Sequence, residues 1–260
     1  MKPPVSTQRA GEARWRGLLF RVMLFTLVLL VAGRKLNAST NDSFQQAVNL
    51  YQSGLFAEAA KEFRIASAKK PASGTLLNLG LSEWRRGRVG AALVAWEQAQ
   101  WIDPFDARVR ENLRYARELT GVESPDLTWY ERASTWLPVN AWAWITGGGL
   151  WLAIGLVVLP GVFRWRRAAW AQALAALGLA GFLFSLPAHV GVVTRTQIGF
   201  VLQKDIPLRM TPTEEAETVT KLASGEPARV ERTRGHYCLV RTAQGRGWIK
   251  RSQIGMICPK

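Results

Sequence analysis

Residues 161–170 read "GVFRWRRAAW" and place three arginines between two long apolar stretches. The stretches, 139–163 and 168–193, contain no Asp, Glu, Lys or Arg. Either one would span roughly 37 Å as a helix, which is enough for a bilayer core of about 30 Å. An arginine in mid-membrane costs about 3 kcal/mol on insertion scales. We therefore expect two transmembrane helices joined by a tight basic turn at 164–167.

The charges beside these stretches predict their orientation. Arg164, Arg166 and Arg167 make the turn basic, whereas residues 118–140 hold four acids and one arginine. Positive charge is retained on the cytoplasmic side of a membrane. The turn is therefore predicted to be cytoplasmic, with both ends of the hairpin outside.

The second apolar stretch is rich in alanine and glycine, which let helices pack closely in lipid. Packing within the hairpin and packing against a companion membrane protein are both open interpretations. His189, near the outer end, is a functional candidate because it is ionisable. The alternative is a neutral histidine that is merely tolerated at the interface.

The start of the chain is basic and then apolar. Five basic residues and one acid precede "VMLFTLVLLVAG" at 22–33. This order is typical of a secretory signal, and the apolar run is shorter than the about 20 residues of a membrane span. Residues 1–38 are therefore predicted to be a signal peptide or an uncleaved N-terminal membrane anchor. Both alternatives export the segment after residue 38, in agreement with the predicted hairpin orientation.

Residues 40–120 contain a repeat with a period of 33 residues. "GLFAEAAKEFRIASAKKP" at 54–71 aligns with "GRVGAALVAWEQAQWIDP" at 87–104. Glycine at a helix end permits the turn into the next helix, small alanines let helices approach, and Phe63 and Trp96 fill the space between them. This pattern resembles the tetratricopeptide repeat, and 105–119 would add a capping helix. Two repeats are fewer than the three usually needed for stability, so we expect the array to lean on the membrane or a partner.

The tetratricopeptide resemblance implies a concave binding face on the first helix of each pair. Its predicted members are Phe44, Val48, Tyr51, Leu77, Leu81, Trp84 and Arg85. The candidate protein-binding residues among them are Tyr51, Leu81, Trp84 and Arg85. A place in the array's core is the alternative for each apolar member. As a group, with Arg85 beside Trp84, they indicate an extended peptide or an acidic tail as ligand.

Residues 198–260 change to short alternating strands separated by glycine and proline, as in small all-β domains. "HYCLVRT" followed by "AQGRGWIKRSQI" predicts a hairpin with Gly245 and Gly247 at its turn. Together with "PLRMTPT" at 207–213, this hairpin resembles a bacterial SH3-like barrel. The resemblance implies binding of peptides or cell-wall components. Tyr237 and Trp248 are candidate ligand-stacking residues, with a core position as the alternative.

The chain has two cysteines and two histidines. In an oxidising exterior a disulfide between Cys238 and Cys258 is expected. Cys238 and His236 as nucleophile and base is a weaker alternative, since such a site needs a base on a separate element and an orienting third group. Without carboxylates this inventory cannot build a four-ligand zinc site. We expect no catalytic residues, cofactor or metal, and a protein that is not an enzyme.

The net charge of +15 indicates either nucleic acid or an anionic membrane surface as partner. However, the basic residues are scattered and no lysine- or arginine-rich run of five occurs, so we expect no nucleic-acid binding. Lipid headgroups are a sufficient partner for much of the charge.

The predicted fold class is a multidomain membrane protein: an all-α tetratricopeptide repeat array, a transmembrane helical hairpin and a small all-β SH3-like barrel. The expected segments are 1–38 (signal peptide or anchor), 40–120 (repeat region), 121–138 (linker), 139–163 and 168–193 (transmembrane helices), 164–167 (cytoplasmic turn) and 198–260 (SH3-like domain). This order, with "NLRYARELT" leading into the hairpin, resembles the BatE-type proteins of bacterial aerotolerance operons.

The BatE resemblance implies a scaffold or adaptor in the bacterial inner membrane, with both soluble domains facing the periplasm. It also implies a role in an aerotolerance or stress-related membrane complex. The implied partners are other membrane or periplasmic proteins, namely von Willebrand A-type membrane proteins and, indirectly, a MoxR-type ATPase. The alternative function is a receptor that binds peptidoglycan through the SH3-like domain.

Overall fold

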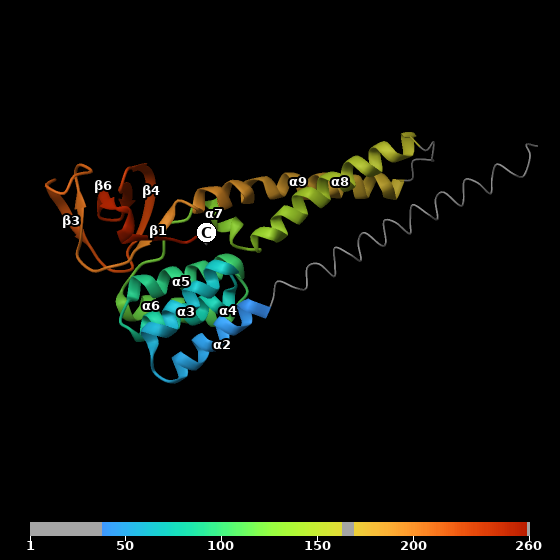
Figure 1. Ribbon diagram of the computed structural model, residues 1–260. Coiled ribbons are helices and arrows are strands. Elements are labelled where there is room, and N and C mark those ends of the chain that lie inside the picture. Colours follow the sequence, from blue (N-terminus) through green and yellow to red (C-terminus); the bar gives the residue numbers. More distant parts are fainter. Residues whose placement is uncertain (1–37, 163–168, 259–260) are drawn as a thin grey trace, which may run out of the picture.

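The computed structural model describes residues 38–162 and 169–258 (Figure 1). The predicted leader and the three arginines of the turn lie outside the described residues. In the described chain a bundle of helices and a β-domain lie at one end of two long helices, which project away from both (Figure 1). The molecule therefore has a compact end and an elongated helical end.

The compact end begins with a helical array. Its helices are α2 (Ala38–Gln52), α3 (Phe56–Lys69), α4 (Ser73–Arg85), α5 (Val89–Ile102) and α6 (Ala107–Thr120). Gly54 and Gly87 have φ angles of 77° and 73°, a left-handed conformation that favours glycine. They separate α2 from α3 and α4 from α5, as the 33-residue period predicts. The helix expected at 105–119 is α6.

The core of the array is built around one large aromatic ring. Trp96 of α5 is 1% exposed, and its Nε1 donates a hydrogen bond of 3.2 Å to the Leu77 carbonyl of α4. A Cβ at Gly80 would lie 2.3 Å from that nitrogen, so the close approach of α4 and α5 requires glycine. Phe63 occupies the equivalent position in the first repeat and is also buried. The aromatic and small positions of the repeat are therefore interior positions, as predicted.

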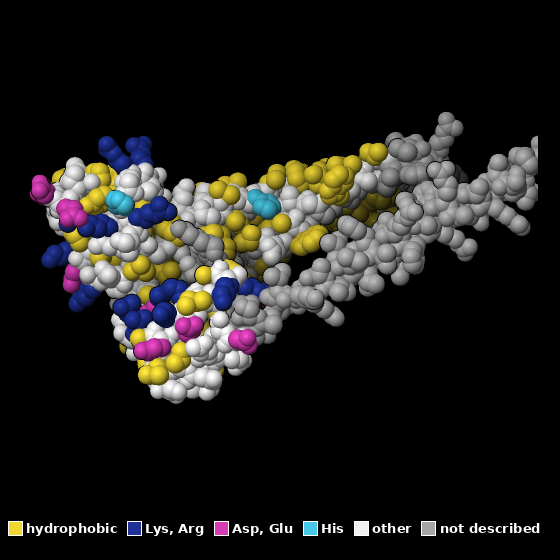
Figure 2. Space-filling model, viewed as in Figure 1, with side chains coloured by type: hydrophobic (Ala, Val, Ile, Leu, Met, Phe, Trp, Pro, Cys, Tyr) yellow, Lys and Arg dark blue, Asp and Glu magenta, His cyan; other side chains and the backbone are white. Residues whose placement is uncertain are grey.

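The elongated end follows the short helix α7 (Trp129–Ser134) and consists of α8 (Val139–Val162) and α9 (Ala169–Arg195). Residues 139–158 of α8 and all of α9 are long and apolar enough to cross a membrane. Large apolar side chains such as Trp144 and Trp151 are mostly exposed, and apolar atoms cover much of this surface (Figure 2). The outer surface of the helix pair is therefore suited to lipid.

Small and hydroxyl side chains join α8 to α9. A Cβ at Gly149 would lie 2.7 Å from the Gly178 carbonyl oxygen, so the two backbones are in close contact there. The Thr146 hydroxyl lies 2.8 Å from the Ser185 hydroxyl and 2.6 Å from His189 Nε2. Close packing within the hairpin is thus the observed use of these small residues, and His189 has a hydrogen-bond partner inside the pair.

The β-domain is a seven-stranded antiparallel sheet with the strand order β3-β2-β6-β5-β4-β1-β7. Its strands are β1 (Ile198–Val201), β2 (Ile206–Arg209), β3 (Thr218–Leu222), β4 (Pro227–Arg234), β5 (Tyr237–Thr242), β6 (Gly245–Lys250) and β7 (Ile254–Met256). The predicted hairpin is β5–β6, in which Thr242 pairs with Gly245. Gly247 lies inside β6, paired with Val240, and not in the turn as predicted. A Cβ there would meet Leu208 at 2.7 Å, so the close approach of β2 requires glycine at this position.

The β-domain packs against α5, a contact that no local sequence pattern predicted. Val94 and Trp101 of α5 share a buried cluster with Ile198 and Phe200 of β1, and Ile257 completes it. A Cβ at Gly90 of α5 would lie 2.1 Å from the Val201 carbonyl oxygen, so helix and strand are in backbone contact. The short array therefore leans on the β-domain of its own chain. We refer to this contact as the junction.

Candidate binding groove at the junction

A carboxylate with an unusually low pKa ties the linker to the β-domain. Glu131 of α7 is fully buried, and Arg229 of β4 donates to its two oxygens at 2.7 and 3.0 Å. The Thr128 backbone N–H donates to it at 2.9 Å. Burial alone would raise the pKa of Glu131, but the hydrogen bonds from Arg229 and Thr128 outweigh burial and lower it to about 2. Glu131 is therefore ionised at neutral pH.

A second set of charges ties the end of α9 to α5. The Arg195 guanidinium lies 4.6 Å from the centre of the Trp101 ring and donates a 3.2 Å hydrogen bond to the Ser134 hydroxyl. Glu97 of α5 is buried beside it and is bonded to Arg117 of α6. Burial raises the pKa of Glu97, while Arg117 and Arg195 act in the opposite direction. The α9 helix thus ends in direct contact with the array.

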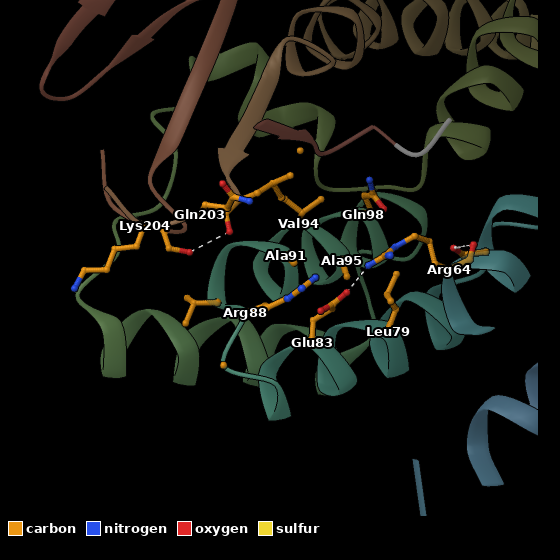
Figure 3. Close-up of a pocket in the computed structure, with 16 residues that line it drawn as sticks. Arg64, Leu79, Glu83, Arg88, Ala91, Val94, Ala95, Gln98, Gln203 and Lys204 are labelled. Atoms are coloured by element: carbon orange, nitrogen blue, oxygen red, sulfur yellow. Dashed lines mark hydrogen bonds and ion pairs between the residues drawn. The ribbon is translucent and has the colours of Figure 1, made fainter. Parts of the chain in front are cut away.

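A groove runs along the border between the array and the β-domain (Figure 3). One part has a volume of about 800 Å³ and lies between α4, α5 and the β1–β2 loop. The other part, about 540 Å³, lies between α3 and strands β4, β5 and β7. Arg64, Ser67 and Gln98 line both parts, so the two parts adjoin each other at these residues. We call the whole the junction groove.

The floor of the junction groove is apolar, and the outermost strand β7 forms part of one wall. Ala91, Val94 and Ala95 of α5 form part of the floor. The outermost strand β7 lies along the wall, and Gln98 Nε2 donates a 2.8 Å hydrogen bond to the Met256 carbonyl. The α5 helix therefore covers the Met256 carbonyl on the outer edge of the sheet.

The rim of the junction groove is basic. Arg64 and Arg88 come from the array, and Lys204 and Arg251 come from the β-domain. Glu83 also lines the groove, but it is 1% exposed and already bonded to Arg64 and Arg86. Figure 3 shows Arg64, Arg88 and Glu83 on the array side and Lys204 on the opposite side. Several Lys and Arg side chains also gather on the array near this border in Figure 2.

Most of the predicted concave-face residues are half-buried and packed on the array. Trp84 lies 5.8 Å from Trp96 and 6.2 Å from Tyr115, measured between ring centres. Tyr51 and Leu81 pack against the core of the array, whereas Arg85 is exposed. Of this predicted set, Leu77 is a core residue at 5% exposure.

The predicted SH3-like ligand residues lie on neighbouring strands. Tyr237 and Trp248 are both partly buried. Tyr237 lines an open cavity of about 630 Å³ together with His236, Lys250 and Arg251. Trp248 pairs with Leu239 across the sheet and does not line that cavity. The structure thus offers Tyr237 to a ligand more directly than Trp248.

The structure bears differently on the two cysteine predictions, the Cys238–His236 pair and the Cys238–Cys258 disulfide. Cys238 is buried and lines the junction groove, whereas His236 is exposed and lines the Tyr237 cavity, so the two are not brought together as a nucleophile and its base. Cys258 lines the same part of the groove as Cys238, with no S–S bond between them. Their disulfide stays a prediction.

Comparison with protein families adds one match. Residues 203–255, from the β1–β2 loop into β7, match the family described as bacterial SH3 domain. The β-domain is therefore an SH3-like domain in both its sequence and its antiparallel sheet. Comparison with curated proteins and with solved structures gives no match. The tetratricopeptide and BatE resemblances remain interpretations of the sequence.

Proposed function

We propose that this protein is a membrane-anchored adaptor that binds other envelope proteins outside the cytoplasm. The observation that carries the proposal is the junction, where Val94 and Trp101 of the array share a core with Ile198 and Phe200 of the SH3-like domain. Bacterial SH3 domains bind proteins or cell-wall components, and helical repeat arrays bind peptides. Joined by one core, the two modules present their surfaces to a partner as a single unit. We therefore propose a binding role rather than a catalytic one.

The proposed location combines three observations. Residues 139–158 and α9 are suited to a membrane by length and composition. The bacterial SH3 match at 203–255 favours a position outside the cytoplasm. The arginine-rich turn at 164–167 and the acidic flank before α8 favour an inner-membrane hairpin with its turn in the cytoplasm.

Reporter fusions test this orientation. Alkaline phosphatase, which is active only after export, is expected to be active when fused after residue 260. A β-galactosidase fused at residue 166 is expected to be active in the cytoplasm, and exchanging the two reporters should silence both. A silent phosphatase at residue 260 would contradict the orientation and, with it, every extracytoplasmic partner.

The resemblance to BatE-type proteins extends the proposal to particular partners. It favours von Willebrand A-type membrane proteins as direct partners and a MoxR-type ATPase as an indirect one. The role would then lie in an aerotolerance or stress-related membrane complex.

Photocrosslinking in intact cells tests the adaptor function. A photoreactive residue at position 85, on the exposed edge of the predicted array face, is expected to capture membrane or periplasmic proteins. The same residue at position 221, on the outermost strand β3, is the control and is expected not to capture them. Removal of residues 198–260 is not a clean alternative, because it would uncover α5. Capture of the same abundant proteins from both positions would contradict the adaptor function.

The family match also favours a second candidate, a receptor that binds peptidoglycan. The Tyr237 cavity is the surface for it, since an aromatic ring lies there beside Lys250 and Arg251. Co-sedimentation with isolated sacculi that is lost in Tyr237→Ala, while capture from position 85 is unchanged, would favour this candidate.

A further inference from the structure

We infer that the junction groove binds an acidic segment of a partner protein in an extended conformation. This inference rests on the proposed adaptor function and adds the chemistry of the ligand. It also moves the ligand from the predicted concave face of the array to its opposite side, where the second helices of the pairs meet the SH3-like domain.

The charge of the groove selects an anionic ligand. Arg88, Lys204 and Arg251 are exposed, and none of them forms an ion pair within the part of the chain that the structure describes. Glu83 does not offset them, because its carboxylate is buried and bonded to two arginines. Cations on both sides of a groove favour a ligand whose carboxylates point to both walls.

The shape of the groove selects an extended peptide. Its two parts adjoin at Arg64, Ser67 and Gln98, so a ligand that occupies both must extend along the border between the array and the β-domain. The Gln253 carbonyl accepts from the Leu202 N–H, and the Ile257 N–H donates to the Ile198 carbonyl. One edge of β7 is therefore paired with β1. The Met256 carbonyl faces away from β1 and accepts from Gln98, and Ile254 and Met256 line the groove, so the outer edge of β7 lies along it. An extended segment matches such an edge.

The lining argues against nucleic acid and sugar. Among the described residues that line the two parts, none is aromatic. Single-stranded nucleic acids are bound by aromatic rings on which bases stack. The floor consists instead of small apolar side chains such as Ala91, Val94 and Ala95, which suit the small side chains of a peptide. A polypeptide with alternating acidic and small residues fits both the rim and the floor.

Fluorescence anisotropy with the full chain in detergent micelles tests the inference. The probe is a fluorescein-labelled peptide of alternating Glu and Ala, and the comparison peptide has Gln in place of Glu. The unaltered protein is expected to bind the Glu peptide about tenfold more tightly than the Gln peptide at low salt. The double variant R88E/K204E is expected to lose the Glu peptide and to bind a peptide of alternating Lys and Ala instead.

The matched control is K61E/R234E, which makes the same change of charge at exposed positions that do not line the groove. It is expected to bind the Glu peptide about as tightly as the unaltered protein. Equal affinity for the Glu and Gln peptides, failure to bind the Glu peptide, or an equal loss in both double variants would overturn the inference.

Crosslinking separates this inference from the adaptor function. The photoreactive residue is placed here at position 203, which is exposed and lines the groove. If R88E/K204E captures the same envelope proteins from position 203 as the unaltered chain does, the basic rim does not hold the partner and the inference fails while the adaptor function stands. If peptide binding follows the expected pattern but no envelope protein is captured from position 203 or from position 85, the groove has the inferred chemistry and the adaptor function fails.

Discussion

Replacing Trp96 by alanine is expected to destabilise the array by about 3–5 kcal/mol, the usual cost of removing a buried aromatic side chain. Trp96 is 1% exposed, packs on Gly80 and donates a hydrogen bond to Leu77. Its removal leaves a cavity between α4 and α5 and removes the hydrogen bond to the Leu77 carbonyl. Chemical unfolding of the full chain in detergent, followed by circular dichroism, measures the change.

The control for this substitution is Trp129→Ala. Trp129 is 70% exposed, so the same change of side chain leaves no interior cavity. Its effect on the free energy of unfolding is expected to be within about 0.5 kcal/mol. If both variants unfold at the same denaturant concentration, Trp96 is not the centre of the array's core.

Acidification is expected to loosen the contact between α7 and the SH3-like domain through Glu131. The pKa of Glu131 is lowered from 4.5 to about 2 in the folded chain. A lowered pKa contributes stability that is present above pH 4.5 and is lost as the pH falls toward 2. A shift of this size corresponds to about 3 kcal/mol. Glu131→Gln is expected to lose this amount at neutral pH and to show no further loss from this position as the pH falls through the same range.

Glu214→Gln is the matched control for Glu131→Gln. Glu214 pairs with Lys250, but its side chain is 73% exposed, so solvent screens the pair. Unfolding free energies measured from neutral pH down to about pH 2 compare the two variants with the unaltered chain. If the Glu131 and Glu214 variants have the same pH dependence, the buried pair with Arg229 does not control acid stability.

Local patterns predicted the helices and the barrel strands well. Gly54 and Gly87 lie at turns, and Phe63 and Trp96 lie in the core, because a helix pair repeats its contacts within a few tens of residues. The two apolar stretches likewise form α8 and α9 because their length and composition are local properties. Such features need no knowledge of how distant segments meet.

The junction could not be predicted in the same way. Contacts such as Gly90 with Val201, and Glu131 with Arg229, join residues far apart in the sequence. One signal was available: α5 is apolar on more sides than a single helix pair can cover, with Glu97 isolated in its middle. The groove residues were missed because Arg88 and Lys204 are ordinary basic residues in turns until the fold places them opposite each other.

The packing of α5 against β1 and β7 has a consequence for biogenesis. The ribosome completes the array before it synthesises the SH3-like domain, whose last strand ends at Met256, near the end of the chain. Until β1 and Ile257 have been synthesised, Val94 and Trp101 lack the side chains that cover them. A chain that stops before β1 therefore leaves an apolar patch exposed on α5, so completion of the helical array depends on synthesis of the SH3-like domain.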